Sequence, residues 1–325
     1  MCTPSPPARK PPRAPDHDEF HLLAIRRRRV RMNASAPMLA DAFELRAGAL
    51  RLALRPDLGG AVAGLWHHGV PVLRSVEPQA LQAARQGGSF ALLPYSNRIA
   101  QARFSWQGRP YRLALGADGG PHALHGVGHL ARWTVEAATL PSGPAEVALV
   151  LEHRADDRWP FDFTARQLLQ LTPTLLRAEL SLTNTSSQPA PAGLGWHPYF
   201  PKRSRSRLHV ECSGRWELDA SKLPTQLVPQ PGIDGDVARL DYDHVFEGVT
   251  GAARIRDERF ALTLRSSLDR LVVYTPQDKD YFAVEPVSHV TNAINQPAPS
   301  ALGLVTLQPG QSHHAWMTLE IQPTH

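Results

Sequence analysis

FDFTARQLLQLTPTLLRAELSLTNTS, residues 161–186, alternates apolar and polar side chains over two runs, with a short break at residues 172–174. Successive side chains of an extended strand point to opposite faces of a sheet, so a period of two predicts a strand with one buried face. The break contains Pro173, a residue typical of turns and unsuited to the middle of a sheet. This stretch therefore predicts neighbouring strands of an antiparallel sheet.

The same alternation continues through most of the chain. It recurs, bounded by Gly, Pro or Asp, in residues 42–48, 49–56, 61–69, 102–115, 132–140, 145–155, 207–218, 259–276 and 313–323. No sustained helical periodicity follows these runs, and the best helix candidate is the short segment PQALQAARQGG at 78–88. We predict an all-β fold, a large antiparallel sandwich, and exclude an alternating βαβ architecture.

Composition narrows the function classes. Of 325 residues, 42% are hydrophobic and 20% charged, which is typical of a globular protein, and no run approaches the ~18 apolar residues of a membrane-spanning helix. The formal charge of +5 includes five arginines within residues 26–31, so it does not indicate a nucleic-acid surface. Cys2 and Cys212 cannot form a disulfide framework, which favours a reducing compartment. We expect a cytoplasmic protein that binds neither nucleic acid nor membrane.

The first residues differ from the rest. Residues 1–37 are basic and proline-rich, lack the apolar core of a secretory signal, and are predicted to be a disordered tail, with Met32 or Met38 as alternative translation starts. Residues 38–325 are predicted to form one β-sandwich domain.

Five segments interrupt the alternation with polar residues beside glycine or proline: 92–104, 119–133, 193–200, 241–248 and 282–295. Each holds an ionisable group between apolar or small residues, and a partly buried charge is costly unless it is paired or used. Singly, each has a structural explanation as a loop or core polar group. Together they indicate a functional site.

Metal and other catalytic motifs are not evident. His122, His125 and His129 are close enough in sequence to be considered as metal ligands, but Gly126 and Gly128 disrupt a helix and no acidic or cysteine partner lies nearby. The chain also lacks HExxH, G-x-S-x-G and GxxxxGK[ST]. We expect no metal.

Five motifs in order resemble the aldose 1-epimerase (galactose mutarotase) family. They are PYSNRI (94–99), HALHG (122–126), GWHPYF (195–200), DHVF (243–246) and VEPVSHVTNAIN (284–295), within a resemblance over about residues 40–322. It implies a β-supersandwich that binds a sugar, as a monomer or homodimer, without a cofactor. It also implies roles for six residues: Glu285 as catalytic base, His197 as catalytic acid, His125 as a contact near the ring oxygen, and Arg98, Asn97 and Asp243 as sugar-hydroxyl ligands.

The implied chemistry fits these residue types. Interconverting α and β anomers requires a base at the C1 hydroxyl and an acid at the ring oxygen. The apolar setting FAVEPV predicts a raised pKa for Glu285, and an imidazolium at His197 is expected to supply the proton at neutral pH.

The sequence leaves three other functions open. In a hexose-6-phosphate mutarotase, Lys202, Arg203, Arg205 and Arg207 are candidates for binding the phosphate, although a solvated loop also explains that run. A glycoside hydrolase would use Asp243 and Glu285 as its two carboxylates. A carbohydrate-binding protein of the same fold would need no proton donor.

Overall fold

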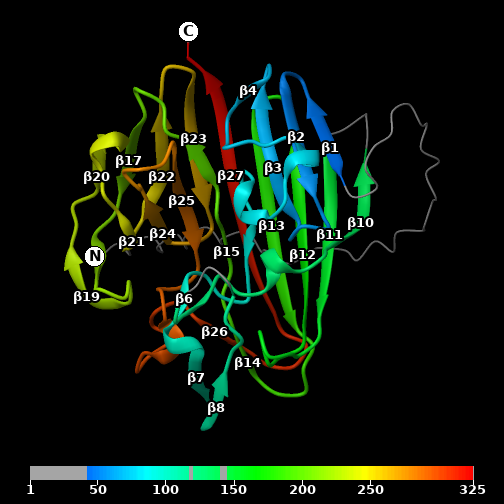
Figure 1. The fold of residues 1–325 in the computed structure, drawn as a ribbon, viewed down its shortest axis with the longest axis vertical. Coiled ribbons are helices and arrows are strands. Elements are labelled where there is room, and N and C mark those ends of the chain that lie inside the picture. The colour runs from blue at the N-terminus through cyan, green and yellow to red at the C-terminus, as the bar shows by residue number, and fades with distance from the viewer. Residues whose placement is uncertain (1–41, 117–119, 140–144, 325) are drawn as a thin grey trace, which may run out of the picture. The chain divides into compact units, whose positions relative to one another are not determined.

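Two large antiparallel sheets dominate the computed structural model, which describes residues 42–116, 120–139 and 145–324 (Figure 1). The described residues belong to one compact unit, Met38–His325. The nine-stranded sheet has the order β10 (Thr134–Thr139), β11 (Ala145–His153), β12 (Phe163–Leu171), β13 (Leu175–Asn184), β27 (Ser312–Pro323), β23 (Phe260–Ser266), β22 (Thr250–Arg256), β17 (Arg207–Glu211) and β20 (Ile233–Asp236).

The eight-stranded sheet carries much of the candidate site. Its order is β19 (Pro224–Pro229), β18 (Gly214–Leu218), β21 (Asp243–Glu247), β24 (Arg270–Tyr274), β25 (Tyr281–Val287), β15 (Gly195–Trp196) and β5 (Ala91–Leu92), with β16 (Tyr199–Pro201) also paired to β25. A four-stranded sheet holds β1 (Phe43–Ala47), β2 (Leu50–Arg55), β3 (Ala61–His67) and β4 (Val70–Pro71). Three two-stranded ladders join β14 (Ala190–Ala192) to β26 (Val305–Leu307), β6 (Arg98–Ile99) to β9 (Ala123–Leu124), and β7 (Arg103–Trp106) to β8 (Arg109–Arg112).

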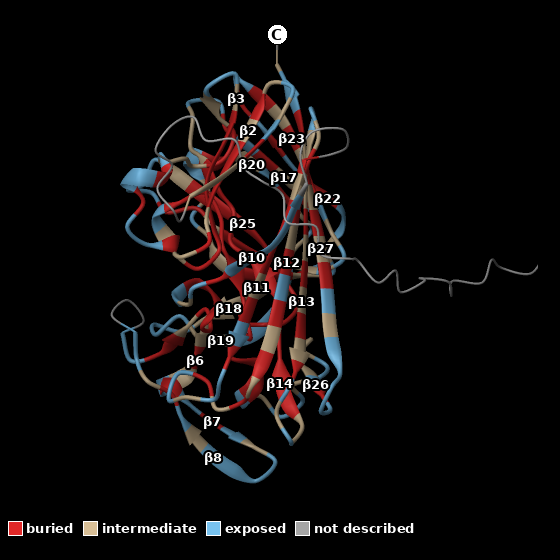
Figure 2. Cartoon of the chain, turned by 90° about the vertical axis from the view of Figure 1, so that its right-hand side faces the viewer, coloured by how far each residue is buried: buried red, intermediate tan, exposed pale blue. Residues whose placement is uncertain are grey.

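The stretch at 161–186 forms β12 and β13, which pair antiparallel from Phe163↔Asn184 to Leu171↔Leu176. Burial alternates along both strands, with the apolar set inward. The inward residues contribute to the hydrophobic core. In Figure 2 buried residues run along β12 and β13, whereas the β7–β8 hairpin is largely exposed or intermediate, with Phe104 as its buried residue. The prediction of a large antiparallel β-sandwich is confirmed.

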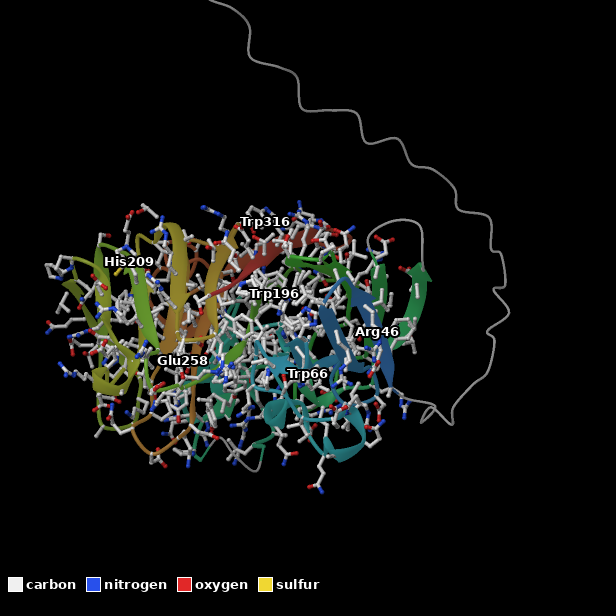
Figure 3. All side chains as sticks on the ribbon, turned by 90° about the horizontal axis from the view of Figure 1, so that it is seen from above. Arg46, Trp66, Trp196, His209, Glu258 and Trp316 are labelled. Atoms are coloured by element: carbon white, nitrogen blue, oxygen red, sulfur yellow. The ribbon has the colours of Figure 1, made fainter. Side chains whose placement is uncertain are left out.

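Trp196 links the two large sheets. Its side chain lies in the interior of the unit (Figure 3) and its indole Nε1 donates to Gln167 Oε1 on β12 at 3.3 Å. Trp196 itself ends β15 of the eight-stranded sheet. Because Trp196 is held in this way, the backbone position of the next residue, His197, is fixed.

The prediction of a helix at 78–88 is wrong. The segment forms two separate 3₁₀ turns, η1 (Pro78–Ala80) and η2 (Ala84–Gln86), with Leu81 in an extended conformation between them. Arginine side chains from elsewhere bind its carbonyls: Arg55 donates to those of Pro78 and Leu81, and Arg74 to that of Gly87. These carbonyls accept hydrogen bonds from arginines and do not need the backbone N–H groups that a helix would supply. The short segment, which ends in two glycines, therefore stays irregular.

The remaining 3₁₀ turns are η3 (Ala100–Ala102), η4 (Gly128–Leu130), η5 (Val237–Arg239) and η6 (Ala293–Asn295). Within the ranges that the structure describes, no helix has the length and apolar character needed to cross a membrane. The prediction for residues 1–37 falls outside the described residues and stays a prediction.

Candidate active site

One cavity of about 220 Å³ brings all six predicted site residues together. Its lining includes Asn97, Arg98, His125, His197, Asp243 and Glu285. Six more residues complete the lining, none of which had been assigned to the site from the sequence: Arg85, Leu124, Tyr199, Val272, Tyr274 and Tyr281. The five segments that interrupt the alternation thus converge on one place.

The pairing register sets His197 opposite Glu285. Strand β25 pairs with β15 at Gly195↔Val287 and with β16 at Tyr199↔Ala283, and the two functional residues lie midway between these pairs. His197 Nε2 lies 3.1 Å from Glu285 Oε1, with the side chains 6% and 3% exposed. The His197 backbone N–H donates to the Phe90 carbonyl, which fixes the backbone at this point.

The pocket occupies one face of the eight-stranded sheet. Tyr281 and Glu285 alternate with Phe282 and Val284 along β25, and the latter two belong to the hydrophobic core. In the register with β24, Val272 lies opposite Glu285, and Tyr274 lies opposite Asp243 on β21. Glu285 and Asp243 therefore lie on strands, and the sheet itself spaces them.

Burial favours the uncharged forms of the central pair. Desolvation raises the pKa of Glu285 well above its ordinary value, and the nearby charge of Asp243 adds to this effect. Desolvation lowers the pKa of His197 well below its ordinary value, and the positive charges of Arg74 and Arg85 act in the same direction. The raised pKa of Glu285 agrees with the expectation. The expected imidazolium at His197 does not, because burial opposes a charge on this ring.

Arg74 does not line the pocket but stacks against two tyrosines that do, Tyr199 and Tyr281, which we call the aromatic wall. Its guanidinium carbon lies 3.8 Å from the ring centroid of Tyr199 and 4.4 Å from that of Tyr281. The same group donates to the Gly87 carbonyl and, by a short contact, to the Arg85 carbonyl. Tyr199 in turn packs on His197 with ring centroids 4.3 Å apart. Arg74 thus connects the aromatic wall to the segment that carries Arg85.

His125 is held as a neutral hydrogen-bond donor. The Asn97 backbone N–H donates to His125 Nδ1 at 3.1 Å. In return, the backbone N–H of His125 donates to the Asn97 carbonyl at 2.9 Å. An acceptor role at Nδ1 leaves the proton of the neutral ring on Nε2. Desolvation lowers the pKa of His125 well below its ordinary value, and a proton on the neighbouring His197 would act in the same direction.

The backbone at His125 is unusual. His125 and Asn97 both have a positive φ, of 63° and 57°. Gly126 follows at 68°, where a Cβ atom would lie 2.1 Å from the Leu93 carbonyl oxygen. A conformation that is rare for residues other than glycine is held here by the β6–β9 ladder and the reciprocal contacts of Asn97 and His125.

Arg98 and Asp243 form the charged rim of the pocket. Arg98 Nη2 lies 3.8 Å from Asp243 Oδ2, and Arg98 Nη1 donates to Asn97 Oδ1 at 3.0 Å. Lys222 Nζ also lies 3.8 Å from Asp243 Oδ2. Arg98 and Asp243 are partly exposed. Together with the buried Asn97 they supply the donors and acceptors that a polyhydroxylated ligand needs.

The basic residues considered for a phosphate lie elsewhere. Lys202 donates to the Pro276 carbonyl, Arg203 pairs with Asp257 at 2.5 Å, Arg207 pairs with Asp234 and Asp236 at 3.1 Å, and Arg205 is exposed. None of the four lines the cavity, so they give the phosphate hypothesis no support.

The three histidines considered as metal ligands have different surroundings. His122 accepts from the Gln101 N–H, whereas His125 faces the cavity and His129 packs against Phe90 with ring centroids 5.3 Å apart. Among the described residues no group of three or more His, Cys, Asp or Glu side chains could hold a metal ion.

Comparison with known proteins agrees with the motifs. A family model described as aldose 1-epimerase matches residues 41–320. YphB of Escherichia coli strain K12, described as uncharacterized, is 31% identical over 297 residues, which cover 86% of this chain and 98% of that protein.

Solved structures share the fold. A galactose mutarotase-like protein from Clostridium acetobutylicum has a TM-score of 0.76 at 22% identity, covering 87% of this chain and 95% of that one. Galactose 1-epimerase from Lactobacillus acidophilus NCFM has a TM-score of 0.72 at 14% identity, with coverage of 86% and 93%. The sequence match over most of the chain, together with this fold, shows that the protein belongs to the aldose 1-epimerase family.

Proposed function

We propose that the protein is an aldose 1-epimerase, a cytoplasmic isomerase that interconverts the α and β anomers of a free hexose. The observation that carries the proposal is the buried, directly opposed pair formed by His197 and Glu285. A sugar oriented with C1 toward this pair would meet a proton acceptor and a proton donor within one pocket, which is what ring opening requires.

In the proposed mechanism Glu285 removes the proton of the C1 hydroxyl while His197 protonates the ring oxygen. The C1–O5 bond breaks, C1 becomes a free aldehyde, and rotation about C1–C2 presents its other face. The ring then closes as Glu285 returns a proton to the C1 oxygen and His197 takes one from the C5 hydroxyl. Atoms and charge balance over the cycle, and no cofactor enters it.

The directions of the two pKa shifts fit this cycle. The closed sugar reacts with Glu285 ionised and His197 protonated, a state reached from the neutral pair by moving one proton across 3.1 Å. Ring opening returns both groups to the uncharged forms that burial favours. The free energy spent on forming the ion pair in this desolvated site is therefore recovered when the ring opens.

The other residues have supporting roles in the proposal. His125, neutral and protonated at Nε2, would donate to the ring oxygen as charge develops there. Arg98, Asn97 and Asp243 would bind ring hydroxyls, and the wall of tyrosines would pack against the apolar face of the sugar.

The test is the rate of optical-rotation change of freshly dissolved α-D-glucose and α-D-galactose with wild type, Glu285→Gln and His197→Asn. We expect acceleration by wild type and a loss of about 10²–10⁴-fold in each variant, the usual contribution of acid–base catalysis. No acceleration of either sugar by wild type, with sugar binding that survives in Glu285→Gln, would replace the proposal with a binding protein.

A further inference from the structure

A second cavity, of about 320 Å³, adjoins the candidate active site. The two cavities share Arg85 and Leu124 in their linings. Between them runs the turn that carries His125, which faces the first cavity, and Gly126, which lines the second. The two cavities are therefore neighbours on either side of this turn.

The walls of the second cavity combine apolar and polar groups. Among the described residues four large apolar side chains are exposed, and two of them, Leu115 at 52% and Leu130 at 55%, lie here. Exposed apolar patches rimmed by polar residues mark interaction sites, ligand-binding grooves among them. Tyr95, His129 and Asp157 add polar groups to the same lining.

The lining of this cavity carries charges of both signs, because Arg85 and Arg158 lie there together with Asp157. Arg158 donates to Asp156 through Nε at 2.8 Å, so its positive charge is already compensated. Asp157 brings a carboxylate to the lining. A sugar ring, with apolar C–H faces and neutral hydroxyls, suits such a mixed surface better than an anionic group does.

The first cavity alone is small. Its volume of about 220 Å³ lies below the range of about 300–1,000 Å³ typical of sites for larger ligands, and is of the size of one sugar ring. The second cavity is the larger of the two. We propose that it is a subsite for a further sugar unit, so that the substrate class is a reducing disaccharide or longer reducing oligosaccharide with its reducing-end ring beside Glu285 and His197.

This inference rests on the proposed function for the placement of the reducing end. No bond of the second unit changes: ring opening at C1 of the reducing-end sugar proceeds as described above, and the glycosidic bond stays intact. The second unit contributes binding energy, so we expect it to raise kcat/KM.

The experiment compares glucose with maltose and isomaltose, which share a glucose reducing end. Anomer exchange at equilibrium is followed by NMR, with wild type, Leu130→Asp and the control Leu227→Asp. Leu227 is also an exposed leucine, 48% accessible, but lines neither cavity. We expect a higher kcat/KM for at least one disaccharide than for glucose, a loss of about tenfold or more in Leu130→Asp for that disaccharide alone, and no change in Leu227→Asp.

A kcat/KM for both disaccharides below that for glucose, unaffected by Leu130→Asp, would overturn the subsite. Absence of exchange with all three sugars would instead reject the proposed function. Titration calorimetry then decides on the subsite separately: disaccharide binding weakened by Leu130→Asp supports it, and equal binding by wild type and Leu130→Asp, or none, rejects it.

Discussion

His197 Nε2 and Glu285 Oε1 face each other at 3.1 Å in the floor of the pocket, while the second polar atom of each side chain, Nδ1 and Oε2, has no hydrogen-bond partner among the described residues. Buried polar atoms without partners are costly, by about 1–3 kcal/mol each when neutral and more when charged. Ionisation of the pair is therefore disfavoured by burial. Burial raises the pKa of Glu285 and lowers that of His197.

The pH dependence of kcat/KM should be bell-shaped. The pair works while it holds one transferable proton, so activity falls at low pH when a second proton binds and at high pH when the last one leaves. Because burial lowers the pKa of His197, the acidic limb should lie below 6.5; because burial raises the pKa of Glu285, the alkaline limb should lie above 4.5. An acidic limb at 6.5 or above, measured by polarimetry across the range, would contradict this assignment.

Glu285→Gln should stabilise the folded protein increasingly as pH rises. Above 4.5 the unfolded chain releases the Glu285 proton while the folded chain retains it, so the wild-type free energy of unfolding falls with pH until the raised pKa of Glu285 is passed. The slope from this group is at most about 1.4 kcal/mol per pH unit. Denaturant unfolding of wild type and Glu285→Gln at pH 4, 6 and 8 measures it. A constant difference between the two proteins at all three values would show that the carboxyl titrates normally.

The sequence predicted the strands with one exposed face better than those buried on both. Strands β12 and β13 carry an alternating pattern because one side of each contacts the core and the other is partly exposed. Strand β25, by contrast, has six buried residues in a row after Tyr281, so its apolar run carries no period and its strand character was missed.

Site residues were predictable where a motif carried them, and not where only the fold did. His197 and Glu285 stand in recognisable motifs, and the register of β15, β16 and β25 then sets them in contact. Arg85 reaches the pocket from the segment mistaken for a helix, and Arg74 acts behind the aromatic wall. No local pattern marks a residue whose contacts are all distant in the chain.

Arg74→Met should shift the acidic limb of the pH profile to higher pH. Desolvation is the main cause of the lowered pKa of His197, and the charge of Arg74 is the next. Without that charge the pKa of His197 rises toward 6.5. Arg74→Lys retains the charge but not the bonds to two carbonyls, so it should keep the limb near its wild-type position while lowering kcat/KM. Equal shifts in both variants would assign Arg74 a purely structural role.

Asp243→Asn should raise KM more than it lowers kcat. A carboxylate that binds sugar hydroxyls in both ground and transition states contributes uniform binding, and losing a charge-assisted hydrogen bond costs about 1.5–3 kcal/mol, or about ten- to a hundredfold in kcat/KM. The control is Glu258→Gln, which neutralises an exposed carboxylate outside the cavity (Figure 3). A large fall in kcat with KM unchanged would instead place Asp243 in the chemical step.

Gly126→Ala should cost both stability and activity, whereas Gly108→Ala should cost only a little stability. Both glycines have a positive φ, of 68° and 78°, so alanine is strained at either position by about 1 kcal/mol. At Gly126 the new Cβ would also meet the Leu93 carbonyl oxygen at 2.1 Å, whereas at Gly108 nothing lies within 4 Å. Overpacking against backbone adds about 1–3 kcal/mol, and the adjustment must move the turn that holds His125.

Denaturant unfolding together with polarimetric assays of the two variants separates these effects. Matching losses of stability in both would mean that backbone strain alone governs the turn. A Gly126→Ala protein with the expected loss of stability but wild-type kcat/KM would show that the position of His125 is not fixed by this glycine, and that the Asn97 contacts are sufficient to hold the imidazole.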